Sequence, residues 1–249
     1  MATVSDQNDA SPHSAIYSPL TRSQVRFIEI IPSGPVDEQV SCRLETMELS
    51  EDIRYAALSY VWGESNITEG VLVNGINLPV TTNLASALRH FRKHGFPYNM
   101  EIGKIQRLWV DAICINQKDI REKGHQVPLM GRLYANASSV LSWLGAPDSS
   151  HLDKALRIIH DIAPVIGATP DHPEIEPTME MIHAGFKWLN STLGTIIDRA
   201  TNTLTTKWAP LQALGRSMYW KRAWIIQEIV LANAKMELCQ VVTSFTDQG

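Results

Sequence analysis

The sequence lacks the short motifs that mark the commonest enzyme sites. It contains no GxGxxG or GxxxxGK[ST] phosphate loop, no GxSxG nucleophile elbow and no HExxH zinc pair. It has only three cysteines, Cys42, Cys114 and Cys239, an odd number spread widely along the chain. This spacing favours reduced thiols over a disulfide framework. The sequence therefore predicts neither a common nucleotide-binding fold, nor a serine hydrolase, nor a zinc protease, nor a disulfide scaffold.

Long apolar runs and an excess of positive charge are also absent. The 249 residues carry a formal net charge of −4, which argues against bulk electrostatic binding to nucleic acid. The apolar runs are much shorter than the roughly 20 residues of a spanning helix, and the N-terminus lacks the apolar core of a signal peptide. A hydrophobic content of 44% is enough for a substantial core. We expect a cytoplasmic globular protein with no membrane span and no nucleic-acid partner.

Alternating apolar and polar segments in the first third of the chain predict strands and one helix. Residues 1–23 are rich in Ser, Asp, Asn and Pro, so we interpret them as a disordered tail. Apolar segments at 25–31, 40–44 and 55–63 predict strands. The segment 71–78 has Asn-Gly between apolar runs, which is typical of a tight hairpin.

A helix is predicted directly after this hairpin. Asn83 precedes Leu84, Leu88 and Phe91 at helical spacing, and Gly95 follows the last turn. Asn is a favoured N-cap and Gly a favoured helix stop. We therefore expect an amphipathic helix that Asn83 caps.

The segment 107–136 is the strongest strand, turn and helix signal. Residues 108–115 form a nearly unbroken apolar run typical of a strand buried on both faces. Asp111 interrupts it, and a carboxylate there needs partners, so it is either a structural anchor or part of a site. A polar turn and a helix follow. Because ligands bind where strands of open α/β sheets end, Asp111, Asn116 and Gln117 are candidate ligand contacts.

The overall pattern predicts one α/β domain over residues 24–245. We expect a mainly parallel central sheet flanked by helices, with a hairpin and further strands near 138–144 and 236–242. Residues 164–206, punctuated by prolines, are expected to form an irregular or helical insertion.

A third informative block lies at 219–228, YWKRAWIIQE. Trp220, Trp224 and Glu228 fall at i, i+4 and i+8, which places two indoles and a carboxylate along one helix face. Two interpretations stay open. Glu228 either pairs with Arg222 or Lys221 as part of the fold, or it belongs to a site.

Three blocks in order, YAALSYVWG at 55–63, LWVDAICINQ at 108–117 with EKGHQV at 122–127, and YWKRAWIIQE at 219–228, resemble the fungal heterokaryon incompatibility (HET) domain. The resemblance covers about residues 25–240. It implies a fungal intracellular module that triggers programmed cell death in non-self recognition, when genetically different cells fuse. Family members often carry further regions downstream, so it implies either a short protein or an isolated domain.

A more distant resemblance to TIR domains bears on mechanism. Leu58-Ser59-Tyr60 is similar to the strand-end Ser-Tyr of those domains, and residues 224–229 are similar to the segment that carries their catalytic glutamate. This resemblance implies a flavodoxin-like fold and cleavage of NAD between nicotinamide and ribose. Glu228 would then be the catalytic carboxylate that stabilises a ribosyl cation.

The residues expected to bind substrate around Glu228 come from three segments, and they are Ser59, Tyr60, Trp62, Asp111, Asn116, Gln117, Arg222 and Trp224. No metal and no cofactor is expected, since NAD would be the substrate. Two alternatives stay open: a non-catalytic death-signalling module that acts by self-association, and a sensor that binds a nucleotide without turnover. For each residue a purely structural role is also open.

Overall fold

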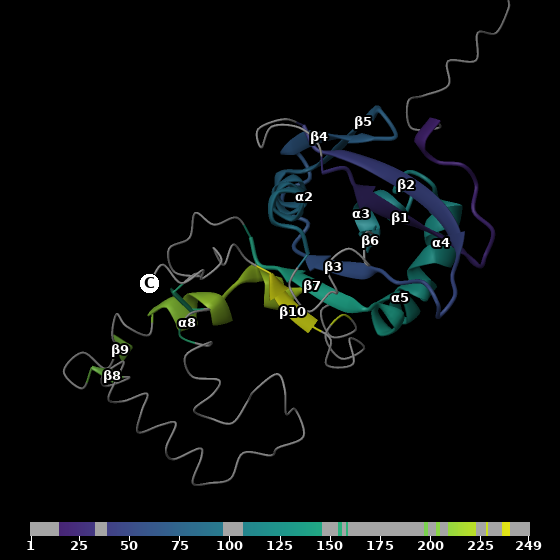
Figure 1. Ribbon diagram of the computed structural model, residues 1–249. Helices are drawn as coiled ribbons and strands as arrows, with labels where there is room; N and C mark the ends of the chain where they lie inside the picture. The colour runs from purple at the N-terminus through teal and green to yellow at the C-terminus, as the bar shows by residue number, and fades with distance from the viewer. Residues whose placement is uncertain are drawn as a thin grey trace, which may run out of the picture. The chain divides into compact units, whose positions relative to one another are not determined.

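The computed structural model describes residues 15–32, 39–96, 107–145, 154–155, 158, 197–198, 203–204, 209–222, 228 and 236–239 (Figure 1). The chain divides into two compact units. The first is Met1–Gly145 with Arg222–Cys239, and the second is Ala146–Lys221 with Gln240–Gly249. Most of the expected tail lies outside the described residues. Within the described part of it, Ile16 and Tyr17 are buried.

Within the described residues, one eight-stranded sheet forms the framework of the first unit, in the order β10-β7-β3-β6-β1-β2-β4-β5. Its strands are β1 (Gln24–Ile30), β2 (Ser41–Glu48), β3 (Ala56–Tyr60), β4 (Thr68–Val73), β5 (Ile76–Thr81), β6 (Arg107–Trp109), β7 (Ser139–Trp143) and β10 (Met236–Cys239). β10, β7, β3 and β6 run parallel to one another.

The other half of the sheet is mostly antiparallel, which corrects the expectation of a mainly parallel sheet. β1 is antiparallel to both β6 and β2, and β4 is antiparallel to β5, while β2 and β4 are parallel. For β4 and β5 the physical reason is their short connection. β4 and β5 are joined by Asn74 and Gly75 at φ of 51° and 80°, the turn that the Asn-Gly pair predicts, and such a turn allows only antiparallel pairing.

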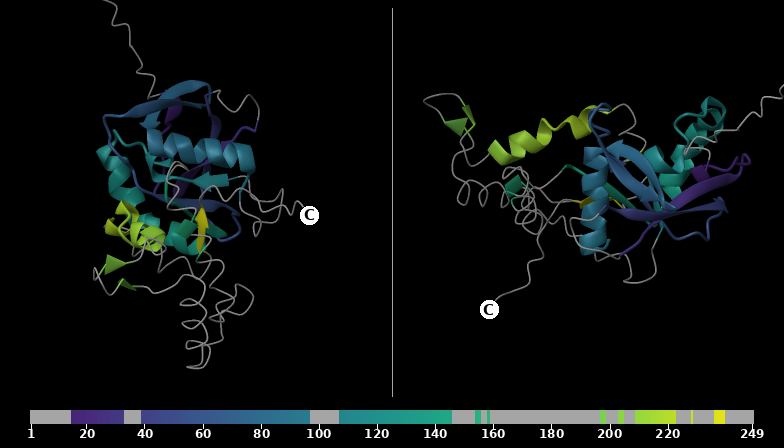
Figure 2. Two further views of the ribbon diagram at one scale, coloured as in Figure 1. Left: turned by 90° about the vertical axis from the view of Figure 1, so that its left-hand side faces the viewer. Right: turned by 90° about the horizontal axis from the view of Figure 1, so that it is seen from above.

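Helix α2 (Thr82–His94) lies against the β4–β5 hairpin (Figure 2). The predicted apolar face is confirmed, since Leu84, Leu88 and Phe91 are buried. The predicted cap is wrong, because the helix already begins at Thr82. The Asn83 amide instead donates from Nδ2 to the Val61 carbonyl at 2.6 Å and accepts from the indole nitrogen of Trp143 at 3.0 Å. Asn83 therefore ties the segment after β3 to the end of β7.

The predicted strand over 108–115 is also corrected. β6 ends at Trp109, and a helical turn, α3 (Asp111–Cys114), replaces its second half. The amides of Ile113 and Cys114 both reach the Val110 carbonyl, at 3.2 and 2.8 Å. A short buried helical turn is as apolar as a buried strand, so hydrophobicity alone does not separate them. The turn places Asp111 at the start of α3 instead of in the middle of a strand.

Beyond α3, the chain forms a nearly continuous helical run that returns to the sheet. The run consists of α4 (Ile120–Gln126), η1 (Val127–Leu129) and α5 (Met130–Asn136), and it leads into β7. Asp119 is the N-cap of α4, and its carboxylate accepts the amides of Arg121 and Glu122. The strand, turn and helix order predicted for this segment is thus confirmed beyond the corrected stretch.

In the second unit, the described residues form β8 (Ile197–Asp198) paired with β9 (Thr203–Leu204), α8 (Ala209–Gly215) and η2 (Met218–Lys221). Most of the expected insertion at 164–206 lies outside the described residues. In the part of the chain that the structure describes, no helix combines the length and apolar character needed to cross a membrane.

Candidate active site

The candidate site forms where β3 and β6 end. All five residues of β3 are buried, and the strand pairs in parallel with β6 on one side and β7 on the other. Because parallel strands end at the same edge, the segments that follow β3 and β6 meet there. The first contributes Trp62 and the second contributes Asp111, and the two side chains are joined by a hydrogen bond of 2.8 Å from the indole nitrogen to Oδ2.

A buried cluster of Ser59, Arg222 and Glu228 lies beside this edge. The Ser59 hydroxyl donates to Glu228 Oε2, and Arg222 Nη2 donates to Glu228 Oε1. Arg222 Nη1 also donates to Ser59 Oγ at 3.2 Å, which closes the triangle. Only 1% of Glu228 is exposed. Both carboxylate oxygens of Glu228 are therefore held in place, one by Ser59, which is 169 positions away in the sequence, and the other by Arg222, which is six positions away.

Asp111 forms a second, separate acidic group. Its Oδ1 accepts the amide of Ala112 at 2.7 Å, and the phenol of Tyr60 is hydrogen-bonded to the carboxylate. Burial raises the pKa of Asp111 above its usual value, the bonds from Trp62 and Ala112 oppose this, and the charge of Glu228 raises it further. The hydrogen bonds that Asp111 accepts therefore stabilise its ionised form against the effect of burial.

Tyr60 is the buried partner of this carboxyl group. Burial raises the pKa of Tyr60 well above its usual value, and the negative charge of Asp111 adds to the effect. The phenol therefore stays protonated at neutral pH and remains a hydrogen-bond donor to Asp111.

A cavity of about 500 Å³ opens at these groups. It has the size usual for a small-molecule pocket. Two carboxylates, one guanidinium, one ammonium and several apolar side chains line it, and the lining residues are Val61, Trp62, Gly63, Asp111, Ile115, Gln117, Lys123, Val127, Met130, Arg222 and Glu228.

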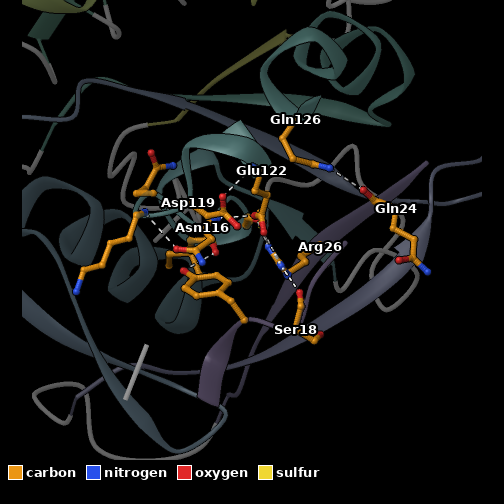
Figure 3. A network of polar contacts seen from close by, with 12 residues as sticks. Ser18, Gln24, Arg26, Asn116, Asp119, Glu122 and Gln126 are labelled. Carbon is orange, nitrogen blue, oxygen red and sulfur yellow. Dashed lines mark hydrogen bonds and ion pairs between the residues drawn. The ribbon is translucent and has the colours of Figure 1, made fainter. Parts of the chain in front are cut away.

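A buried ion pair supports the segment that carries Asp111 (Figure 3). Arg26 on β1 reaches Glu122 on α4 through two bonds, Nη1 to Oε1 at 2.6 Å and Nη2 to Oε2 at 3.0 Å. Arg26 also donates to the carbonyls of Cys114 at 3.1 Å and Ser18 at 2.6 Å. Glu122 accepts the amide of Asn116 at 2.7 Å. The pair thus fixes both ends of the short connection between α3 and α4.

The structure brings most of the predicted site residues together, with two exceptions. Ser59, Tyr60, Trp62, Asp111, Gln117, Arg222 and Glu228 line the cavity or bond to residues that do. Asn116 does not line it; its amide bonds to Glu122 and its side chain accepts the amide of Lys118 at 3.1 Å, so it shapes the turn. Trp224 lies outside the described residues.

One wall of the cavity is not predicted by the sequence. Lys123, Val127 and Met130 line it at i, i+4 and i+7, one face of the helical run from α4 to α5. The helical spacing was visible in the sequence, but an apolar face is usually core, and nothing in the spacing marked this one as a cavity wall.

Candidate metal ligands are His, Cys, Asp and Glu side chains that lie close together. Among the described residues, no group of three or more His, Cys, Asp or Glu side chains is placed to hold a metal ion. What the arrangement offers is a fixed carboxylate, a second carboxyl group with a raised pKa, and hydrogen-bond donors around a pocket. These groups suit the orientation of hydroxyls and the stabilisation of positive charge.

This combination defines an α/β protein with a polar small-molecule pocket at the carboxyl ends of parallel strands. A family model described as "Heterokaryon incompatibility protein (HET)" matches residues 55–228, and the chain belongs to this family. All residues that line the cavity fall within the matched segment.

One curated relative is similar over nearly the whole chain. The chain is 30% identical over 273 residues to "Heterokaryon incompatibility protein 6, OR allele" of Neurospora crassa. The similarity covers 98% of this chain but 38% of the relative, so the chain spans little more than a third of that protein's length. No solved structure matches the chain significantly.

Proposed function

We propose that this chain is a module of fungal heterokaryon incompatibility that triggers programmed cell death by cleaving NAD or a related nucleotide at the cavity. Family membership and the name of the Neurospora relative support the role in incompatibility. The geometry around Glu228 supports the chemistry.

The observation that carries the proposal is a carboxylate fixed at both oxygens on the wall of a cavity. Glu228 lines the cavity, and Ser59 and Arg222 hold its two oxygens. Such a group does not need to reorganise as charge develops, which is the property that makes electrostatic stabilisation effective.

Cleavage of the bond between nicotinamide and ribose develops positive charge on the ribose. Nicotinamide leaves with the bonding electrons, and water then adds to the ribosyl cation to give ADP-ribose and a proton. Glu228 stabilises the ribosyl cation and binds ribose hydroxyls. Asp111, whose raised pKa brings its proton affinity closer to neutral pH, orients the ribose and accepts the proton from water.

The other lining groups have supporting roles in this mechanism. Trp62 donates to Asp111, and Gln117 donates from Nε2 to the Asp111 backbone carbonyl at 2.8 Å, so both fix the position of that residue. The apolar wall of Ile115, Val127 and Met130 favours a flat aromatic ring over bulk water.

The test is release of nicotinamide from NAD by the purified chain, measured by liquid chromatography. We compare wild type with Glu228→Gln and with a matched control, Glu51→Gln, which changes an exposed carboxylate in the turn before β3. We expect equal turnover by wild type and control and a loss of about 100-fold or more in Glu228→Gln. No turnover by concentrated wild type, or full turnover by a folded Glu228→Gln protein, would refute the proposal.

A second candidate function is signalling by self-association without catalysis. It is favoured by large apolar side chains on the surface of the sheet unit, Trp62, Ile67 and Ile120, which are 43%, 50% and 81% exposed. In that case Glu228→Gln would keep full toxicity when expressed in cells, while Ile120→Asp would lower both toxicity and the sedimentation coefficient.

A further inference from the structure

The charged side chains that line the cavity differ in whether they have a hydrogen-bond or ion-pair partner in the protein. Glu228 is paired with Arg222 and bonded to Ser59, and Asp111 takes hydrogen bonds from Trp62 and Ala112. Lys123 is different, because its ammonium group makes no ion pair or hydrogen bond within the described part of the chain. One positive charge on the cavity wall is therefore left without a protein partner there.

The fold places this ammonium at the cavity for a simple reason. Glu122 is turned into the core by its ion pair with Arg26. Since successive residues of a helix are about 100° apart, its neighbour Lys123 faces a different direction, and it lines the cavity. It is half-buried, so its charge acts in a medium less polar than water.

The same helix face continues with apolar residues. Val127 and Met130 follow Lys123 at i+4 and i+7, and both line the cavity. Across one wall the cavity thus presents an ammonium group and then an apolar surface. A ligand that fits this order carries an anionic group next to a flat or apolar one.

We propose that Lys123 forms a phosphate-binding subsite, so that the cavity selects phosphorylated nucleosides over their unphosphorylated forms. The proposal rests on the proposed function for the ribose and base contacts, but not for the anion contact itself. Lys is a common ligand for phosphate, which it binds as a compact point charge. A cavity of about 500 Å³ has room for the phosphate together with a nucleoside.

The experiment measures dissociation constants by calorimetry for nicotinamide mononucleotide and nicotinamide riboside, which differ by one phosphate, and for NAD. Three versions of the whole 249-residue chain are compared: wild type, Lys123→Met and Lys118→Met. Lys118 is a matched control, because it is exposed in the preceding turn and does not line the cavity. The ratio between the two nicotinamide ligands is insensitive to a modest loss of stability, so it separates recognition from folding.

We expect wild type and Lys118→Met to bind the mononucleotide about 10- to 100-fold more tightly than the riboside, the effect of one charge-assisted contact. We expect Lys123→Met to bind the two ligands equally, with unchanged affinity for the riboside. Equal affinity of wild type for both ligands, or an unchanged ratio in Lys123→Met, overturns the subsite.

The subsite and the enzymatic proposal fail in different ways. If the mononucleotide and NAD bind through Lys123 but no nicotinamide is released, the subsite stands and the hydrolase is refuted. If the riboside binds and is cleaved as well as the mononucleotide, the hydrolase stands and the subsite is refuted. If wild type binds none of the three ligands, both are refuted.

Discussion

Replacing Arg26 with methionine should destabilise the sheet unit strongly. Arg26 is 1% exposed and makes four hydrogen bonds, two to Glu122 and one each to the carbonyls of Ser18 and Cys114. The variant leaves the carboxylate of Glu122, itself 4% exposed, without its counter-charge. Loss of one partner of such a buried pair costs about 3–5 kcal/mol.

The matched control is Arg43→Met. Arg43 pairs with Glu29 across neighbouring strands at 2.6 Å, but its side chain is 57% exposed, and an exposed pair of this kind contributes about 0–1 kcal/mol. Both variants remove one guanidinium from the same sheet. The difference between their losses in free energy of unfolding therefore reports the effect of burying the ion pair.

The assay is urea unfolding followed by circular dichroism, together with the thermal midpoint. At about 2–4 °C per kcal/mol, Arg26→Met should lower the midpoint by roughly 6–20 °C and Arg43→Met by less than about 4 °C. The double variant Arg26→Met, Glu122→Met should be less destabilised than the sum of its parts, because it leaves no unpaired charge. Equal losses in the two single arginine variants would refute the reasoning.

Two further predictions concern stability. Burial, helped by the charges of His94 and Lys93, lowers the pKa of His90 from 6.5 to about 4, so the unfolded chain takes up a proton at a higher pH than the folded one. The stability contributed by His90 is therefore complete above pH 6.5 and is lost as the pH falls towards 4. In His90→Gln, the free energy of unfolding measured with urea should vary less with pH over this window. The same pH dependence in wild type and variant would contradict this. Tyr55→Phe removes a buried bond of 2.7 Å to the Leu133 carbonyl and should cost about 1–3 kcal/mol in the same assay, whereas no loss would show that the bond is unimportant.

The elements of the parallel half of the sheet could largely be predicted from the sequence. The segments 55–63 and 138–144 are short and apolar, and the structure forms β3 and β7 within them. The mixed character of the sheet could not be predicted in the same way, because the direction of β1 relative to β6 depends on pairing between segments some 80 residues apart. The hydrophobic pattern of a strand indicates which of its faces is buried, but it does not indicate which other strand it pairs with.

The site was partly predictable for a related reason. Polar residues at strand ends, such as Ser59 and Asp111, stand out because a polar group beside a buried strand needs partners. The role of Asn83 was mistaken, since an amide before an apolar helix face has the same local signature whether it caps that helix or bonds to Val61 and Trp143. Lys123 carried no signal at all, because a lysine on a helix is ordinarily a solvated residue.

In the proposed mechanism, Glu228 acts on a ligand in the cavity instead of merely stabilising the fold. The most direct measurement is toxicity on expression in cells, with NAD assayed in the same cultures, for wild type, Glu228→Gln and Glu51→Gln at equal protein levels. We expect wild type and Glu51→Gln to deplete NAD and arrest growth, and Glu228→Gln to do neither. Arrest of growth by Glu228→Gln as complete as by wild type, with NAD unchanged in all three cultures, would contradict it.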